Sequence, residues 1–217
     1  MKGLIVKDFI NVSKNFWVIG VIIIFYGVLA FLTDSPGSFS GMFTLIFAMF
    51  LIGTYSLDEL ANWDSYALSM PLTRDNIVQG KYLMMLLLAL LGFLVNAVSL
   101  LILNMATKAE SLFGGFELPL GGVVVVIIFY SVLLPIISKL GITKARIYFI
   151  IIYMVPFLLG MLIYKKLKED NLIPPERLME VIEMVKNNIY IIAPLVVIVL
   201  LGISYSISIG IYRKKEF

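Results

Sequence analysis

Six long apolar stretches dominate this sequence and limit the folds that the chain can adopt. They lie at residues 16–33, 39–57, 83–106, 120–138, 147–164 and 189–212. A helix needs about 20 apolar residues to cross the hydrocarbon layer of a bilayer, and such a helix satisfies its own backbone hydrogen bonds. We therefore expect an all-α integral membrane protein, with six transmembrane helices in a single domain over residues 1–217. The first stretch is interpreted as a retained anchor, because residues 29–35 offer no small-x-small cleavage site.

Charged residues are too scarce for a soluble domain. They make up 14% of the chain, and hydrophobic residues make up 61%, whereas soluble domains contain about 25% charged residues. The net charge of +3 is small and indicates no nucleic-acid partner. Cys and His are both absent from the sequence, which excludes disulfides, thiol chemistry, the usual zinc sites and His-based acid–base catalysis.

The lysine and arginine residues predict the orientation of the chain. With six spans, both termini and residues 58–81 share one side of the membrane. The other side carries six of the 17 basic residues: Lys108, Lys165, Lys166, Lys168, Arg177 and Lys186. The remaining eleven lie on the side of the termini. Because basic residues concentrate in cytoplasmic loops, we expect a multi-pass protein of the plasma membrane with both termini in the cytoplasm.

Two further segments are amphipathic rather than spanning. Residues 3–12, GLIVKDFINV, fit a helix in the cytoplasmic interface. Its apolar residues at helical spacing are Leu4, Ile5, Phe9 and Val12, and its polar residues Lys7, Asp8 and Asn11 fall elsewhere. Residues 174–188, PPERLMEVIEMVKNN, place Pro175 at a position suited to a first helical turn. This segment predicts a short extracellular helix before the last span.

The sequence contains no recognisable catalytic or ATP-binding motif. The six stretches hold no Asp, Glu, Lys or Arg, so an intramembrane aspartyl protease would lack its carboxylate pair. The serine segment GISYS, at 202–206, lacks the final glycine of a nucleophile elbow. The pair Gly80-Lys81 lacks the other residues of a phosphate-binding loop. We therefore expect no enzyme activity, cofactor or metal site in this chain itself, and an energy source on a partner.

Polar and small residues inside the stretches allow two interpretations each. Asn96 and Ser99 share one face of the third stretch. An interhelical hydrogen bond is favoured there, and contact with a transported substrate along a translocation path is the alternative. Gly202, Ser206 and Gly210 form a ridge of small residues in the last stretch. Helix packing within the chain is favoured for this ridge, and contact with another subunit is the alternative.

The polar insert at 58–81, DELANWDSYALSMPLTRDNIVQGK, is the largest cytoplasmic feature. Its first half can form a short helix that Pro71 ends, and Thr73 can cap a second helix that continues into the third stretch. Trp63 and Tyr66 are residue types that dominate binding interfaces. They also mark membrane edges in many proteins. The length of the insert and its acidic start favour a docking element for another protein.

Residues 65–83, SYALSMPLTRDNIVQGKYL, resemble the segment that follows the second span in ABC-2 type transporter permeases. There a phrase of the form S-L-P-[VL]-[ST]-R-x-x-I-V-x-x-[KR]-Y follows a cytoplasmic coupling helix. The resemblance implies a permease subunit that pairs with a second, identical or related permease and with two separate subunits that bind ATP and Mg. It also implies export of hydrophobic or amphipathic peptides, including antimicrobial peptides and peptide toxins.

The resemblance assigns roles within the insert. We expect Asp58 and Glu59 to meet basic groups of the ATPase, and Trp63 and Tyr66 to fill its groove. The helix from Arg74 would pass the movement to the third stretch. The full set of expected ATPase-coupling residues is Asp58, Glu59, Trp63, Asp64, Tyr66, Arg74, Asp75 and Lys81. The alternative function is a non-transporting membrane protein, such as a bacteriocin-immunity or membrane assembly factor.

Overall fold

The computed structural model describes residues 2–14, 16–32, 40–106, 115–169 and 175–215. These residues form helices and no strands, so the all-α prediction is confirmed for the part of the chain described. The helices are α1 (Lys2–Ser13), α2 (Phe16–Leu32), α3 (Ser40–Leu60), α4 (Trp63–Ser69), α5 (Arg74–Ala106), α6 (Glu117–Leu140), α7 (Ile142–Glu169) and α8 (Pro175–Lys214).

A helix occupies the place of each predicted span, but fewer helices meet the length and hydropathy of a membrane crossing. Within the described residues, three do so: α5, α6 and the Ala193–Lys214 part of α8. A fourth is added if α1 and the Phe16–Phe25 part of α2, which meet at a bend of 50°, are one broken span. The chain is therefore a multi-pass membrane protein, and the six-span layout remains a prediction.

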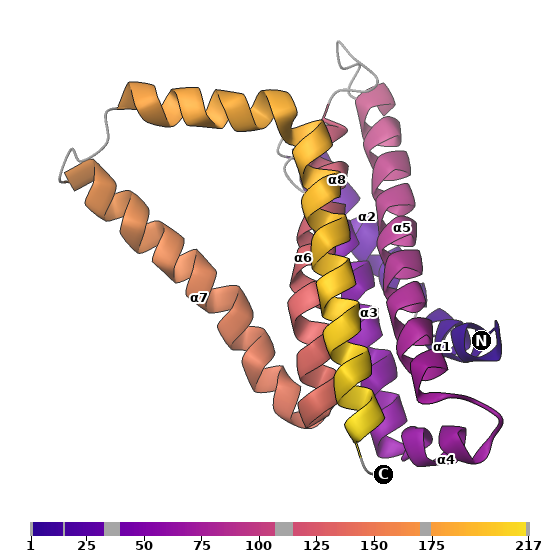
Figure 1. Ribbon diagram of the computed structural model, residues 1–217. Coiled ribbons are helices and arrows are strands. Elements are labelled where there is room, and N and C mark those ends of the chain that lie inside the picture. Colours follow the sequence, from indigo (N-terminus) through magenta and orange to yellow (C-terminus); the bar gives the residue numbers. More distant parts are fainter. Residues whose placement is uncertain (1, 15, 33–39, 107–114, 170–174, 216–217) are drawn as a thin grey trace.

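The helices α3, α5, α6 and α8 run side by side and enclose the core (Figure 1). The most deeply buried side chains are large and apolar: Leu51, Met84, Met85, Leu88, Leu133 and Leu134. Gly92 brings α5 close to α3, because a methyl group on Gly92 would lie 2.9 Å from the Cα atom of Thr44. Tyr130 of α6 donates a hydrogen bond to the carbonyl of Ala48 at 2.5 Å. These contacts make the core a closely packed unit.

A single helix, α8, covers both the predicted extracellular helix and the last predicted span. It begins at Pro175, as expected, and continues to Lys214 with Pro194 inside it. Figure 1 shows a bent helix: its first part lies across the end of the bundle opposite α4, and the rest runs along α6. The prediction of two separate helices fails because the chain bends without leaving the helical conformation. Helices in membrane proteins tolerate proline in this way.

The connection between α6 and α7 directs α7 away from the core. Gly141 joins α6 to α7 with a φ of 76°, a left-handed conformation that glycine adopts without strain. Figure 1 shows α7 diverging from α6 and α8 along its length. Ile142 and Ala145, both near its start, are its buried side chains among those described.

Candidate coupling site at the elbow

The elbow, residues 58–81, comprises the end of α3, the short helix α4 and the first turns of α5. The predicted first helix starts later than expected: α3 continues through Leu60, and α4 begins at Trp63. The break occurs because Asn62 adopts a positive φ of 48°, which asparagine tolerates better than most residues. The cap predicted at Thr73 is confirmed, because its hydroxyl accepts a hydrogen bond from the backbone N–H of Asn76 at 3.2 Å.

The helix α4 lies at the end of the bundle near the C-terminus and has an inner and an outer face (Figure 1). Ala67 is fully buried and joins the core. Tyr66 is 58% exposed, and Leu60, just before the helix, is 82% exposed. Trp63 is half-buried, and its ring lies 5.5 Å from the ring of Tyr66. The elbow therefore presents two large exposed side chains and one sheltered tryptophan at its tip.

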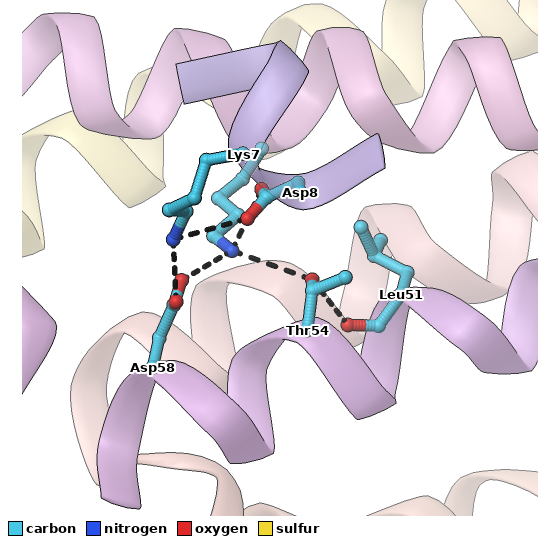
Figure 2. Close-up of polar contacts among 6 residues, drawn as sticks. Lys7, Asp8, Leu51, Thr54 and Asp58 are labelled. Atoms are coloured by element: carbon cyan, nitrogen blue, oxygen red, sulfur yellow. Dashed lines mark hydrogen bonds and ion pairs between the residues drawn. The ribbon is translucent and has the colours of Figure 1, made fainter. Parts of the chain in front are cut away.

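Four charged residues of alternating sign form a closed ring beneath the elbow. The Lys7 ammonium lies 3.1 Å from Asp8 and 2.5 Å from Asp58. The Lys81 ammonium lies 2.9 Å from Asp8 and 2.6 Å from Asp58. Figure 2 shows Lys7 and Asp8 on one helix facing Asp58 on another. We call this set the charge ring; it joins α1, α3 and α5 and carries no net charge.

Lys81 is a buried lysine whose three donor positions are all used. Besides the two carboxylates of the charge ring, its ammonium donates to the hydroxyl of Thr54 at 3.3 Å. Thr54 in turn donates to the carbonyl of Leu51 at 2.9 Å, as Figure 2 shows. The ring of Tyr55 lies 4.6 Å from the ammonium. A buried ammonium is tolerated only with such compensation, so Lys81 fixes the carboxylates around it.

The helix α1 packs through a face that includes part of the predicted apolar stripe and also Asp8. Its buried residues are Leu4, Asp8 and Val12, at spacings of four, whereas Phe9 is exposed. A methyl group on Gly80 of α5 would lie 3.4 Å from Cβ of Leu4, so this glycine allows α1 to approach. Sequence reasoning missed the roles of Lys7, Asp8 and Thr54. The signal that could have shown Asp8 is its position midway between two buried apolar residues.

Glu59 connects the elbow to α7. Its carboxylate accepts hydrogen bonds from the backbone N–H of Ile142 at 2.5 Å and of Thr143 at 3.3 Å, and from the Thr143 hydroxyl at 2.6 Å. Partial burial raises the pKa of this carboxyl, but the hydrogen bonds from Thr143 and Ile142 outweigh burial and leave the pKa below its usual value of 4.5. The side chain thus caps the first turn of α7 from a distant part of the sequence.

Asp75 and Arg74 connect the elbow to the end of α8. Arg213 donates to the carboxylate of Asp75, with one nitrogen at 2.9 Å, and Arg74 donates to the carbonyl of Arg213. One turn further along α5, Gln79 donates to the hydroxyl of Tyr205 at 2.7 Å. Asp64 lines a cavity of about 290 Å³ together with Asp58, Lys81, Tyr212 and Lys215. The elbow therefore contacts α1, α7 and α8 through polar groups.

These positions differ from the roles expected for two of the acidic residues. The carboxylates of Asp58 and Glu59 are engaged inside the chain, whereas the sequence analysis expected them to meet basic groups of an ATPase. Tyr66 has the exposure expected of a docking residue, and Trp63 has it in part. Contact between any of them and an ATPase stays a prediction.

The other sequence-predicted residues lie away from the elbow. Asn96 is buried in the core, and Ser99 donates to the carbonyl of Val95 in its own helix at 2.8 Å. Gly202, Ser206 and Gly210 are all exposed on α8. A methyl group on either glycine would meet no atom within 4 Å. Within the described part of the chain the ridge faces outward, and contact of the ridge with another subunit stays a prediction.

Comparison with known proteins identifies the family of the chain. The family model described as ABC-2 family transporter protein matches residues 3–213. No curated protein and no solved structure matches this chain. The family match spans nearly the whole chain, from the start of α1 to the end of α8, and includes the elbow and the charge ring. The chain therefore belongs to the ABC-2 family of transporter proteins and is a permease of the ABC-2 type.

Proposed function

We propose that this chain is the six-span permease subunit of an ATP-driven exporter, with ATP hydrolysed on a separate subunit that docks on α4. Permeases of this family generally work with an ABC ATP-binding subunit. The observation that carries the proposal is the position of α4. It is a short helix at the bundle end, with an exposed tyrosine, and the helices on either side of it, α3 and α5, make polar contacts with α1, α7 and α8.

The docking surface in this proposal consists of Leu60, Trp63 and Tyr66. Tyr66 and Leu60 supply the exposed apolar contact, and Trp63 supplies a ring that is sheltered on one side. Tyrosine and tryptophan are frequent centres of binding energy at protein interfaces. Movement of α4 then reaches α5 directly through the chain, and it reaches α7 and α8 through Glu59 and Asp75.

Orientation, stoichiometry and substrate complete the proposal. The elbow and both termini face the cytoplasm, which agrees with the excess of basic residues on that side. Two ATP-binding subunits serve two permeases, and the exposed small-residue ridge of α8 offers a place for close helix contact between permeases. The proposed substrates are hydrophobic or amphipathic peptides, on the basis of the family resemblance.

The test is the affinity of the purified permease for its ATP-binding subunit, measured in detergent. Tyr66→Ala and Trp63→Ala should each weaken binding by about thirtyfold, which corresponds to roughly 2 kcal/mol for a central aromatic residue. Tyr148→Ala is the matched control, because Tyr148 is an exposed tyrosine on α7, outside the proposed docking surface. Wild-type affinity in both elbow variants would refute docking on α4.

A further inference from the structure

The sequence of α4 alone is not sufficient to keep it helical. It is seven residues long, and the residue before it, Asn62, makes no side-chain cap. Helices this short are unstable in isolation, because too few hydrogen bonds repay the cost of nucleation. Its position therefore depends on contacts with the rest of the chain. Ala67 supplies one such contact by joining the core, and the ring of Trp63 supplies another.

The contact at Trp63 comes from α1. The Lys7 ammonium lies 4.2 Å from the centre of the Trp63 ring. A lysine over the face of a tryptophan is attracted by the negative face of the ring. A lysine side chain is long and has many rotamers, so it stays over the ring only if other groups hold it there. In this protein those groups are the carboxylates of Asp8 and Asp58.

The charge ring determines where Lys7 can lie. Asp8 and Asp58 each face both ammonium groups, and Lys81 is almost completely enclosed, with 8% of its side chain exposed. Because Lys81 is buried and has all its donors engaged, the two carboxylates cannot turn away without leaving a buried charge unpaired. Lys7 is the more exposed member, with 22% of its side chain accessible. Lys7 is therefore the member of the charge ring that extends toward α4.

We propose that the charge ring is a positioning device for the docking helix: Asp8, Asp58 and Lys81 hold Lys7 over Trp63, and Lys7 sets the orientation of α4 before the ATP-binding subunit arrives. The last step rests on the proposed function. In this arrangement Lys7 makes the contact, and the other three act through it. The device makes α1 a support of the docking surface, although Lys7 lies 56 residues before Trp63 in the sequence.

The first part of the test reads the Trp63 ring without any partner. The chain has two tryptophans, so Trp17→Phe leaves Trp63 as the sole tryptophan, which is excited at a wavelength that tyrosine does not absorb. In that background, Lys7→Met and Asp58→Asn should each increase acrylamide quenching of Trp63 about twofold, because the ring loses its cover. Lys7→Arg should keep the wild-type value, since arginine also stacks on aromatic rings. Lys14→Met, which removes an exposed charge immediately after the same helix, is the matched control.

The second part measures binding of the ATP-binding subunit to the same variants. Lys7→Met should lower the affinity by about fivefold, the size expected for a partly exposed cation–ring contact. The loss should disappear when Lys7→Met is made in a Trp63→Ala chain, because the two residues then have no interaction left to lose. Asp58→Asn should give at least the same loss, and Lys7→Arg should give none.

The two parts separate the failure of this inference from the failure of docking. Unchanged quenching of Trp63 in Lys7→Met overturns the positioning role, and Lys7→Met keeps this result meaningful even if Asp58→Asn does not fold. Changed quenching with wild-type affinity, in a chain where Tyr66→Ala does weaken binding, also overturns it. If Tyr66→Ala and Trp63→Ala both bind like wild type while quenching responds as expected, docking on α4 is refuted and the positioning of α4 by the charge ring is supported.

Discussion

The helices α5 and α7 are both long and apolar, but the chain holds them in opposite ways. Buried residues of α5 occur from Ile77 to Asn104, almost over its whole length. In α7 the described buried residues, Ile142 and Ala145, lie within the first turn or so. From Ile147 to Leu162, the described side chains of α7 are exposed, apart from the half-buried Ile152. Figure 1 shows the same contrast in the course of the two helices.

This difference between α5 and α7 indicates that apolar content does not determine which helix forms the core of a membrane protein. Lipid tails are as apolar as leucine, so close packing and polar contacts decide. Gly80 and Gly92 let neighbouring helices approach α5 closely, whereas Gly160 of α7 has open space beside it. Lys81 adds a buried polar anchor to α5. By contrast, α7 depends on the cap that Glu59 gives to its first turn.

Removing the buried charge of α5 should have the largest effect. Lys81→Met leaves two carboxylates facing one lysine, and breaking a buried ion pair costs about 3–5 kcal/mol. Lys144→Met, an exposed lysine at the start of α7, should change stability by less than about 0.5 kcal/mol. The measurement is the free energy of unfolding in detergent. Equal losses of stability in Lys81→Met and Lys144→Met would contradict the difference between α5 and α7.

A double variant tests the ring itself. Asp8→Asn combined with Lys81→Met keeps a neutral Lys7–Asp58 pair, so it should lose less stability than the two single changes combined.

A methyl group added to each helix tests packing alone. Gly92→Ala should cost about 1–3 kcal/mol, because the added carbon would meet the backbone of α3 at Thr44. Gly160→Ala should be neutral or stabilising by up to about 1 kcal/mol, since alanine favours helix and the site is open. Thermal melting of the two variants compares them directly. A destabilised Gly160→Ala would show that α7 is also closely packed.

The smallest effect should come from the cap that holds α7. Glu59→Ala should cost about 0.5–1 kcal/mol, the lower part of the range for caps, because the carboxylate is largely exposed to solvent. The loss should be local and raise amide hydrogen exchange at Ile142 and Thr143. Unchanged amide hydrogen exchange at these two residues would show that Glu59 does not stabilise the start of α7.

The same cap has a defined pH dependence. The folded pKa of Glu59 lies below 4.5 because hydrogen bonds stabilise its carboxylate form. The cap therefore contributes fully above pH 4.5 and is lost as the pH falls through the folded pKa. The ratio of the amide exchange rates at Ile142 and Thr143 between Glu59→Ala and wild type should be constant from about pH 8 to 5. It should approach one as the pH falls below 4.5. A ratio that approaches one near pH 7 would mean another group is responsible.

The fold was predictable to the extent that local pattern determines it. Apolar length placed helices at all six stretches, Pro71 and Thr73 marked the elbow, and Pro175 marked the start of α8. The continuity of α8 was not predictable, because Pro194 disfavours a helix in isolation and is tolerated here. The residues of the elbow were found from their type and position, but their partners were not.

The partners were missed because they are distant in the sequence. Glu59 and Thr143 are 84 residues apart, and Asp8 and Lys81 are 73 residues apart. No periodicity within a helix reports such pairs. Asp8 also stands on a face where an apolar residue is the ordinary expectation, since burying a carboxylate is costly without a cation beside it. The packing of α1 against α5 supplies Lys81 as the buried cation beside Asp8.

The charge ring also sets an order for the synthesis of the protein. Lys7 and Asp8 leave the ribosome first, Asp58 follows, and Lys81 comes last, 73 residues after Asp8. Until Lys81 is inserted, two acidic groups share one basic group, and the inner face of α1 has no α5 to cover it. The packing of α1 in the bundle is therefore complete only after the start of α5 has been made. A chain stalled between Asp58 and Lys81 would present this uncovered face to the quality-control proteases of the cell.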